Sequence, residues 1–121
     1  MMLEQAKILI VDDEDLFRTM LRAMVEKIGY SNISEASSGS AALIMAKKSK
    51  PDIIMLDINM PDMDGIIVAQ QMNKISPNSQ IVMMTGCSTP SKVIASMHAG
   101  VANYLIKPFR EQQLRSILEK L

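Results

Sequence analysis

The sequence predicts an α/β protein built on a doubly wound, five-stranded parallel sheet. Four short runs are apolar without alternation, which is typical of strands covered by helices on both faces. Helical patterns fill the intervals between these runs, so strand and helix alternate five times along the chain. The 121 residues suit one domain and are too few for a closed eight-stranded barrel with its helices. We therefore expect a single open sheet over residues 1–121.

The individual elements follow from local patterns in chain order. The expected strands cover residues 8–11, 33–36, 53–56, 81–84 and 104–106, and only the second alternates apolar with polar, as an edge strand does. The expected helices cover residues 16–28, 40–49, 65–73, 90–99 and 110–121. Gly29 ends the first helix, and Thr89 with Pro90 begins the fourth as N-cap and first helical residue.

The methionines are numerous, and most of the 12 are expected in the core as flexible filling. The ones expected there include Met20, Met24, Met55, Met83, Met84 and Met97. Met60 and Met63 are expected instead in a loop beside the site described below.

Composition excludes several classes of protein. Thirteen basic residues cancel thirteen acidic ones, and no basic run is present, so we expect no direct binding to nucleic acid. The longest purely apolar run has six residues, far short of a membrane span, and the N-terminus lacks a signal-peptide pattern. Cys87 alone makes neither an internal disulfide nor a cysteine zinc site. We expect a cytoplasmic protein without membrane contact.

Polar residues follow four of the five predicted strands at the point where each ends. Asp12 and Asp13 follow the first strand, Asp57 the third, Thr85 the fourth and Lys107 the fifth. Each residue has an ordinary reading on its own: helix cap, turn former, strand residue or solvated end. Their convergence is the informative feature, because the carboxyl ends of parallel strands share one edge, where ligands bind in open α/β sheets.

Clustered carboxylates repel one another unless a cation joins them or their pKa values rise. Oxygen ligands suit Mg²⁺, with Mn²⁺ as a possible substitute. A carboxylate also serves as nucleophile toward a phosphoryl group, and the ammonium and hydroxyl neutralise charge on the transferring oxygens. The sequence therefore indicates a magnesium-dependent phosphoryl-transfer site.

Four motifs resemble the receiver domain of two-component response regulators of the chemotaxis-regulator type. They are Val-Asp-Asp-Glu at 11–14, Asp-Ile-Asn-Met-Pro-Asp-Met-Asp-Gly at 57–65, Thr-Gly at 85–86 and Tyr-Leu-Ile-Lys-Pro-Phe at 104–109. The match covers nearly the whole chain with normal spacing. The resemblance implies a flavodoxin-like fold with strand order 2-1-3-4-5 and one receiver domain over residues 1–121. The receiver accounts for all of these residues, so we expect no effector domain within them, and the chain is either a stand-alone regulator or part of a longer protein.

The resemblance also implies roles for individual residues. Asp57 is the expected phosphoacceptor, and the expected metal ligands are Asp12 (through water), Asp13, Asp57 and the backbone carbonyl of Asn59. Lys107 and Thr85 would contact the phosphate, and Tyr104 would move with Thr85 as a switch. The residues expected to set loop geometry are Pro61, Gly65, Gly86 and Pro108, the last after a cis peptide bond. Asn59 and Cys87 stand where the family tunes its phosphorylation and hydrolysis rates.

The expected partners are a sensor histidine kinase or histidine phosphotransfer protein, and a downstream effector that binds the fourth helix, fifth strand and fifth helix. The chain would be a monomer or a phosphorylation-linked dimer, without enzymatic turnover beyond self-catalysed phosphorylation and dephosphorylation. One alternative is a haloacid-dehalogenase-like phosphatase, although Asn59 replaces the second aspartate of that family. Another is an interaction module that never becomes phosphorylated.

Overall fold

The computed structural model describes residues 2–86 and 89–121. Five strands alternate with five helices, and a 3₁₀ turn over Leu3–Gln5 precedes them. The strands are β1 (Lys7–Val11), β2 (Asn32–Ala36), β3 (Ile53–Asp57), β4 (Gln80–Thr85) and β5 (Asn103–Ile106). The helices are α1 (Asp15–Ile28), α2 (Gly39–Ser49), α3 (Gly65–Ile75), α4 (Pro90–His98) and α5 (Glu111–Leu118). Within the described ranges, none of the helices has the length and apolarity that crossing a membrane requires.

The five strands form one parallel sheet in the order β2-β1-β3-β4-β5, which confirms the expected fold class and strand order. The order reverses beside β1, because β2 lies on one side of it and β3 on the other. Ligand sites in open α/β sheets form at this reversal, beyond the carboxyl ends of the strands. The ends of β1 and β3 therefore mark the place to look for a site.

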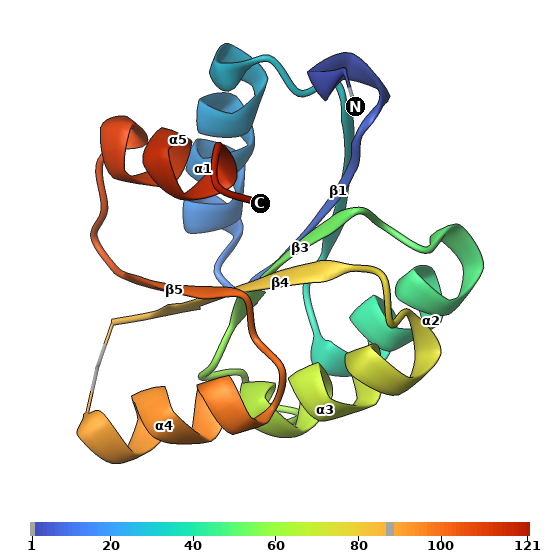
Figure 1. The fold of residues 1–121 in the computed structure, drawn as a ribbon, viewed down its shortest axis with the longest axis vertical. Coiled ribbons are helices and arrows are strands. Elements are labelled where there is room, and N and C mark those ends of the chain that lie inside the picture. The colour runs from blue at the N-terminus through green and yellow to red at the C-terminus, as the bar shows by residue number, and fades with distance from the viewer. Residues whose placement is uncertain (1, 87–88) are drawn as a thin grey trace.

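Helices cover both faces of the sheet, as Figure 1 shows: α1 and α5 lie on one side, and α2, α3 and α4 on the other. Successive residues along each strand point to opposite faces of the sheet and pack into the two cores. Leu9 and Leu56 join the core under α2 and α3, whereas Ile10 and Met55 join the core under α1 and α5. Burial on both faces explains why these strands lack an alternating pattern.

The helix faces differ from the sequence expectation at several methionines. Met24 is half-buried and Met55, Met83 and Met84 are buried, but Met20 is 45% exposed and Met97 is 52% exposed, so the core assignment was wrong for these two. On α1 the buried stripe runs through Leu21 and Val25, and Met20 lies one position, or about 100°, away from it. Met97 likewise follows the buried Ser96 on α4.

Two smaller differences concern a loop and a helix end. Met60 was expected outside the core, yet only 9% of it is exposed and it belongs to the core under α2 and α3. The last helix ends at Leu118 and not at residue 121.

Gly65 is the glycine that the site loop requires for space. A Cβ at this position would lie 2.5 Å from the carbonyl oxygen of Asp57 and 2.6 Å from the Cα of Ile58. The backbone N–H of Gly65 donates to the carbonyl of Ile58 at 2.8 Å, so the loop closes tightly behind β3. This close approach explains the glycine at the start of α3.

We predict that Gly65→Ala lowers the free energy of unfolding by about 2 kcal/mol, because backbone must move away from the new methyl group. Gly86→Ala is the matched control, since a Cβ there would meet no atom of the described residues within 4 Å. The control should stay within about 0.5 kcal/mol of the parent protein. Urea unfolding of the three proteins measures both values, and equal stability of the two variants would contradict the prediction.

Candidate functional site

The predicted polar residues meet at the carboxyl edge of the sheet. Asp12 and Asp13 follow β1, Asp57 and Thr85 are the last residues of β3 and β4, and Lys107 follows β5. Val11 pairs with Leu56 in the β1–β3 register, so the two acidic segments leave the sheet side by side. The convergence expected from the sequence is thus present in the structure.

Three carboxylates form the centre of the site. One oxygen each from Asp12, Asp13 and Asp57 lies within 4.8 Å of the others. Asp12 and Asp57 are buried, whereas Asp13 is exposed at the mouth of the cluster. Hard carboxylate oxygens, one of them open to solvent, fit a divalent cation such as Mg²⁺ that keeps part of its water shell. The donor set therefore fits the metal that the sequence predicts.

Lys107 supplies the positive charge that faces these carboxylates. Its Nζ lies 2.6 Å from Oδ2 of Asp12 and 3.7 Å from Oδ2 of Asp57. The backbone N–H of Lys107 donates to the carbonyl of Thr85 at 2.7 Å, which holds the lysine beside the end of β4. The Lys107–Pro108 peptide bond is cis, as the family resemblance implies.

An aromatic pair supports the lysine from the α1 side. The ammonium lies 4.0 Å from the centroid of the Phe17 ring, a favourable cation–π arrangement. The Phe109 ring packs edge-to-face against the Phe17 ring and holds it in place. The two ring centroids lie 5.9 Å apart, at an interplanar angle of 83°. The position of the Lys107 charge thus depends on packing as well as on its carboxylate partners.

Burial raises the pKa of Asp57 to about 6. This value also reflects the charges of Asp12 and Asp13, which raise the pKa, and Lys107 and a hydrogen bond from the backbone N–H of Asn59, which lower it. Burial is the largest of these effects, because a carboxylate loses its water shell on leaving solvent. Above a pH of about 6 the site accordingly holds a buried negative charge that a cation would stabilise.

Asn59 and Thr85 line the site on the side of β4. The backbone N–H of Asn59 donates to Oδ1 of Asp57 at 3.3 Å, and its side-chain Nδ2 lies 3.5 Å from Oγ1 of the fully buried Thr85. Tyr104 is partly buried and packs against the core under α2 and α3. Cys87, expected to tune reaction rates, lies outside the described residues.

Contacts within and beyond the site loop hold it in place. Asp64 caps α3 through the N–H of Ile66 at 2.8 Å. Asp62 reaches away from the site and accepts hydrogen bonds from the N–H groups of Gly39 and Ser40, each at 3.1 Å. The loop that carries Pro61 is thereby anchored to the first turn of α2.

Sequence reasoning missed three residues around the site. Asp62, Phe17 and Arg18 all contact segments distant in sequence, so spacing gave no signal for their roles. Glu14, the N-cap of α1, makes no side-chain capping hydrogen bond, whereas Oδ1 of Asp12 accepts a hydrogen bond from the N–H of Glu14 at 2.8 Å. Arg18 donates to the backbone carbonyl of Asp12 at 2.6 Å.

Comparisons with known proteins agree with this geometry. The family model of the response regulator receiver domain matches residues 8–119. The chain is 36% identical to the chemotaxis protein CheY of Thermotoga maritima over 115 residues, 95% of this chain and 96% of that protein. Chemotaxis protein CheY4 of Vibrio cholerae has a solved structure with a TM-score of 0.88 at 32% identity, covering 95% and 97% of the two chains.

A further solved structure is the receiver domain of the sensor histidine kinase PA1611 from Pseudomonas aeruginosa, with a magnesium ion coordinated in its active-site cleft. Its TM-score is 0.86 at 26% identity, and the match covers 95% of each chain. The likeness to all of these proteins spans the sheet and is not confined to one motif.

We predict that the burial of Asp57 makes the metal-free protein less stable as pH rises. The folded state holds the Asp57 proton up to a pH of about 6, whereas the unfolded chain releases it near its ordinary pKa of 3.8. The contribution of Asp57 to the free energy of unfolding is therefore fully present below pH 3.8 and is lost as the pH rises to about 6. The total loss is roughly 3 kcal/mol.

Asp57→Asn removes this loss. Urea unfolding in a chelator should show the variant more stable than the parent at pH 8 and similar to it at pH 4. A variant without any advantage at pH 8 would contradict the buried-charge explanation.

We predict that Lys107→Met destabilises the metal-free protein by about 3 kcal/mol, because it leaves the buried Asp12 charge without its partner. Mg²⁺ should restore part of this loss by replacing the positive charge. The control is Lys48→Met, at an exposed position on α2, which should change stability by less than about 0.5 kcal/mol. Thermal unfolding with chelator and with Mg²⁺ measures both effects.

Proposed function

The chain belongs to the response regulator receiver domain family, and from this premise we propose that Asp57 accepts a phosphoryl group in a magnesium-dependent reaction. The observation that carries the proposal is the meeting of a buried Asp57 with Asp12, Asp13 and Lys107 at the reversal of the sheet. Two acids beside the acceptor and one ammonium are the charges that such a transfer needs.

Asp57 supplies the nucleophile. One carboxylate oxygen forms a bond to phosphorus while the bond from phosphorus to the donor's histidine nitrogen breaks, and that nitrogen keeps the electron pair. The carboxylate must be ionised to attack, and a pKa of about 6 leaves Asp57 mostly ionised at the pH of the cytoplasm, which we propose as its compartment.

The neighbouring residues hold the group that arrives. Lys107 would contact the phosphoryl oxygens, which its distance of 3.7 Å from Asp57 supports, and the Thr85 hydroxyl at the end of β4 would be the second contact. Asp12, Asp13, Asp57 and the carbonyl of Asn59 would hold Mg²⁺, with Mn²⁺ as a possible substitute. When bound, the cation would neutralise negative charge on the transferring oxygens.

The proposal includes one partner that donates the phosphoryl group and one that binds the phosphorylated protein. A sensor histidine kinase or histidine phosphotransfer protein would donate the phosphoryl group, and a downstream effector would bind the α4-β5-α5 face. That face suits a partner because it exposes apolar side chains, namely Ile94 and Met97 on α4 and Ile106 on β5. We propose a monomer or a phosphorylation-linked dimer that contacts neither nucleic acid nor membrane.

The proposal includes no turnover on external substrates. A haloacid-dehalogenase-like phosphatase needs a second aspartate two residues after the nucleophile, and the residue there is Asn59. The amide of Asn59 donates toward Thr85 and does not supply an acid. Phosphorylation and its reversal would therefore be the protein's only chemistry.

We predict that Asp57→Asn abolishes labelling by acetyl phosphate in the presence of Mg²⁺, because the amide cannot form the acyl phosphate. Asp52→Asn is the control, an aspartate at the opposite end of the sheet that accepts a hydrogen bond from the N–H of Lys7. The control should be labelled like the parent, as measured by intact mass with and without chelator.

Two results would overturn the proposal. One is undiminished labelling of Asp57→Asn at another residue. The other is continued release of phosphate from p-nitrophenyl phosphate by the parent protein, which would revive the phosphatase alternative.

A further inference from the structure

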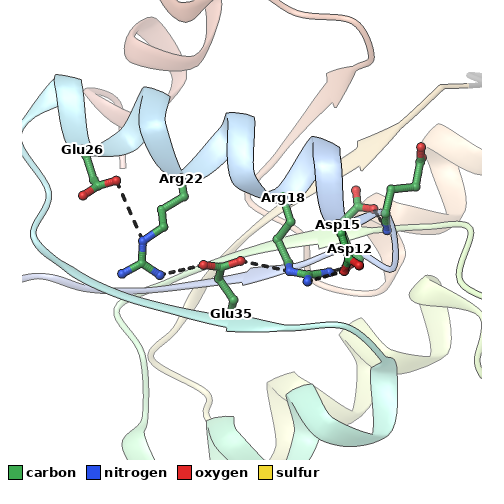
Figure 2. Close-up of polar contacts among 7 residues, drawn as sticks. Asp12, Asp15, Arg18, Arg22, Glu26 and Glu35 are labelled. Carbon is green, nitrogen blue, oxygen red and sulfur yellow. Dashed lines mark hydrogen bonds and ion pairs between the residues drawn. The ribbon is translucent and has the colours of Figure 1, made fainter.

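Arg18 on α1 uses its whole guanidinium to join three segments behind the acidic cluster. Nη1 donates to the backbone carbonyl of Asp12 at 2.6 Å, Nε donates to Oε1 of Glu35 at 3.0 Å, and Nη2 donates to Oδ1 of Asp15 at 2.6 Å. Figure 2 shows the Arg18 side chain extended from α1 between Glu35 and the acidic residues. Only 14% of this side chain is exposed, so its contacts with Asp12 and Glu35 are partly shielded from water, whereas Asp15 lies open to solvent.

These contacts hold the backbone of one residue, Asp12, on both its N–H side and its carbonyl side. The backbone N–H of Asp12 donates to the carbonyl of Ala36 at the end of β2, and Glu35, the residue before Ala36, holds Arg18. Arg18 in turn donates a hydrogen bond to the carbonyl of Asp12. The backbone of Asp12 is thus held on its N–H side by β2 and on its carbonyl side by a side chain that β2 also holds.

The orientation of that carbonyl restricts where Asp13 can point. The carbonyl of Asp12 and the N–H of Asp13 belong to one planar peptide group, so fixing the carbonyl fixes the plane from which Asp13 begins. Asp13 is the exposed carboxylate of the cluster, and no hydrogen bond to its own side chain is recorded among the described residues. Its place therefore depends on its backbone more than the places of the buried Asp12 and Asp57 do.

We propose that Arg18 is a positioning residue that holds the Asp12–Asp13 peptide so that Asp13 faces the cation site. This inference rests on the proposed function, because it concerns how the cation is held. Arg18 does not touch the cation or the phosphoryl group, and it acts through the backbone carbonyl of Asp12. Supports of this kind are typically worth tenfold or more in metal affinity.

A guanidinium suits this task better than an ammonium. Three different nitrogen atoms of Arg18 reach three different acceptors at once, which the planar fork allows. Glu35 is itself fixed by a second arginine, since Nη1 of Arg22 donates to its Oε2 at 2.7 Å. The hydrogen bond from Arg22 is the largest of the effects that lower the pKa of Glu35, so this anchor stays ionised at neutral pH.

Arg22 provides a matched control. It lies one helical turn after Arg18, carries the same charge and binds the same glutamate, but none of its recorded contacts reaches Asp12 (Figure 2). Electrostatics alone predicts that removing either arginine tightens cation binding, because a positive charge near the site disappears. Loss of positioning predicts the opposite sign, and only for Arg18.

The test measures Mg²⁺ affinity of the full chain by calorimetry at pH 8 and constant ionic strength. We expect Arg18→Gln to bind Mg²⁺ about tenfold more weakly than the parent. Arg22→Gln should bind equally or up to about twofold more tightly. Arg18→Lys keeps the charge, but its single nitrogen cannot take the three positions of the guanidinium nitrogens, so it should also bind several-fold more weakly.

Equal or tighter Mg²⁺ binding by folded Arg18→Gln would overturn the inference, as would equal weakening in Arg22→Gln, which indicates a general loss of packing between α1 and β2. Circular dichroism establishes folding, and Arg18→Lys decides the question if the glutamine variant does not fold.

A second measurement needs no metal. Hydrogen exchange at the amide of Glu14, which donates to Oδ1 of Asp12 at 2.8 Å, should accelerate in Arg18→Gln and not in Arg22→Gln. If the parent protein binds no Mg²⁺, the proposed function fails. The exchange rate of the Glu14 amide then tests by itself whether Arg18 holds the backbone of Asp12. Unchanged exchange in both variants would overturn the positioning role.

Discussion

The ion pair between Lys107 and Asp12 is the interaction on which the site depends. Asp12 is fully buried and Asp57 nearly so, and two such charges beside each other need a cation within reach. Lys107 starts at the end of β5 and meets Asp12 at the end of β1, so its side chain passes the ends of β4 and β3. The pair therefore ties together the carboxyl ends of strands from opposite halves of the sheet.

The fold was predictable because a strand that is buried on both faces of the sheet consists of consecutive apolar residues, and the sequence shows such runs. Runs such as residues 53–56 have no polar face, and a parallel sheet between two helical layers buries such a strand on both sides. The site followed from the same rule, since residues that come directly after parallel strands share an edge. Asp57 and Lys107 could be placed together without any knowledge of the contact between them.

The helix faces and supporting contacts were less predictable, for a physical reason. Met20 and Leu21 are adjacent apolar residues on α1, and only the direction in which the helix packs decides that Leu21 is buried and Met20 exposed. Arg18 and Glu35 stand on different elements, so their pairing depends on β2 lying beside β1. Local patterns identify an element and its ends, but contacts between elements arise only when the sheet order is known.

The supports of the site also differ in what they allow to move. Asp12 is held through its backbone and both carboxylate oxygens, by Arg18, Glu14 and Lys107. Lys107, by contrast, lies closer to Asp12 than to Asp57, and its own backbone is bonded to Thr85. A phosphoryl group on Asp57 would add negative charge beside this ammonium and draw it toward a second partner. Because the Lys107 backbone and Thr85 are joined, that attraction would act on the end of β4 as well. In the proposed function, Asp12 would stay fixed while Lys107 moves toward the phosphorylated Asp57. A change of charge at Asp57 would in this way become a change of conformation at the end of β4.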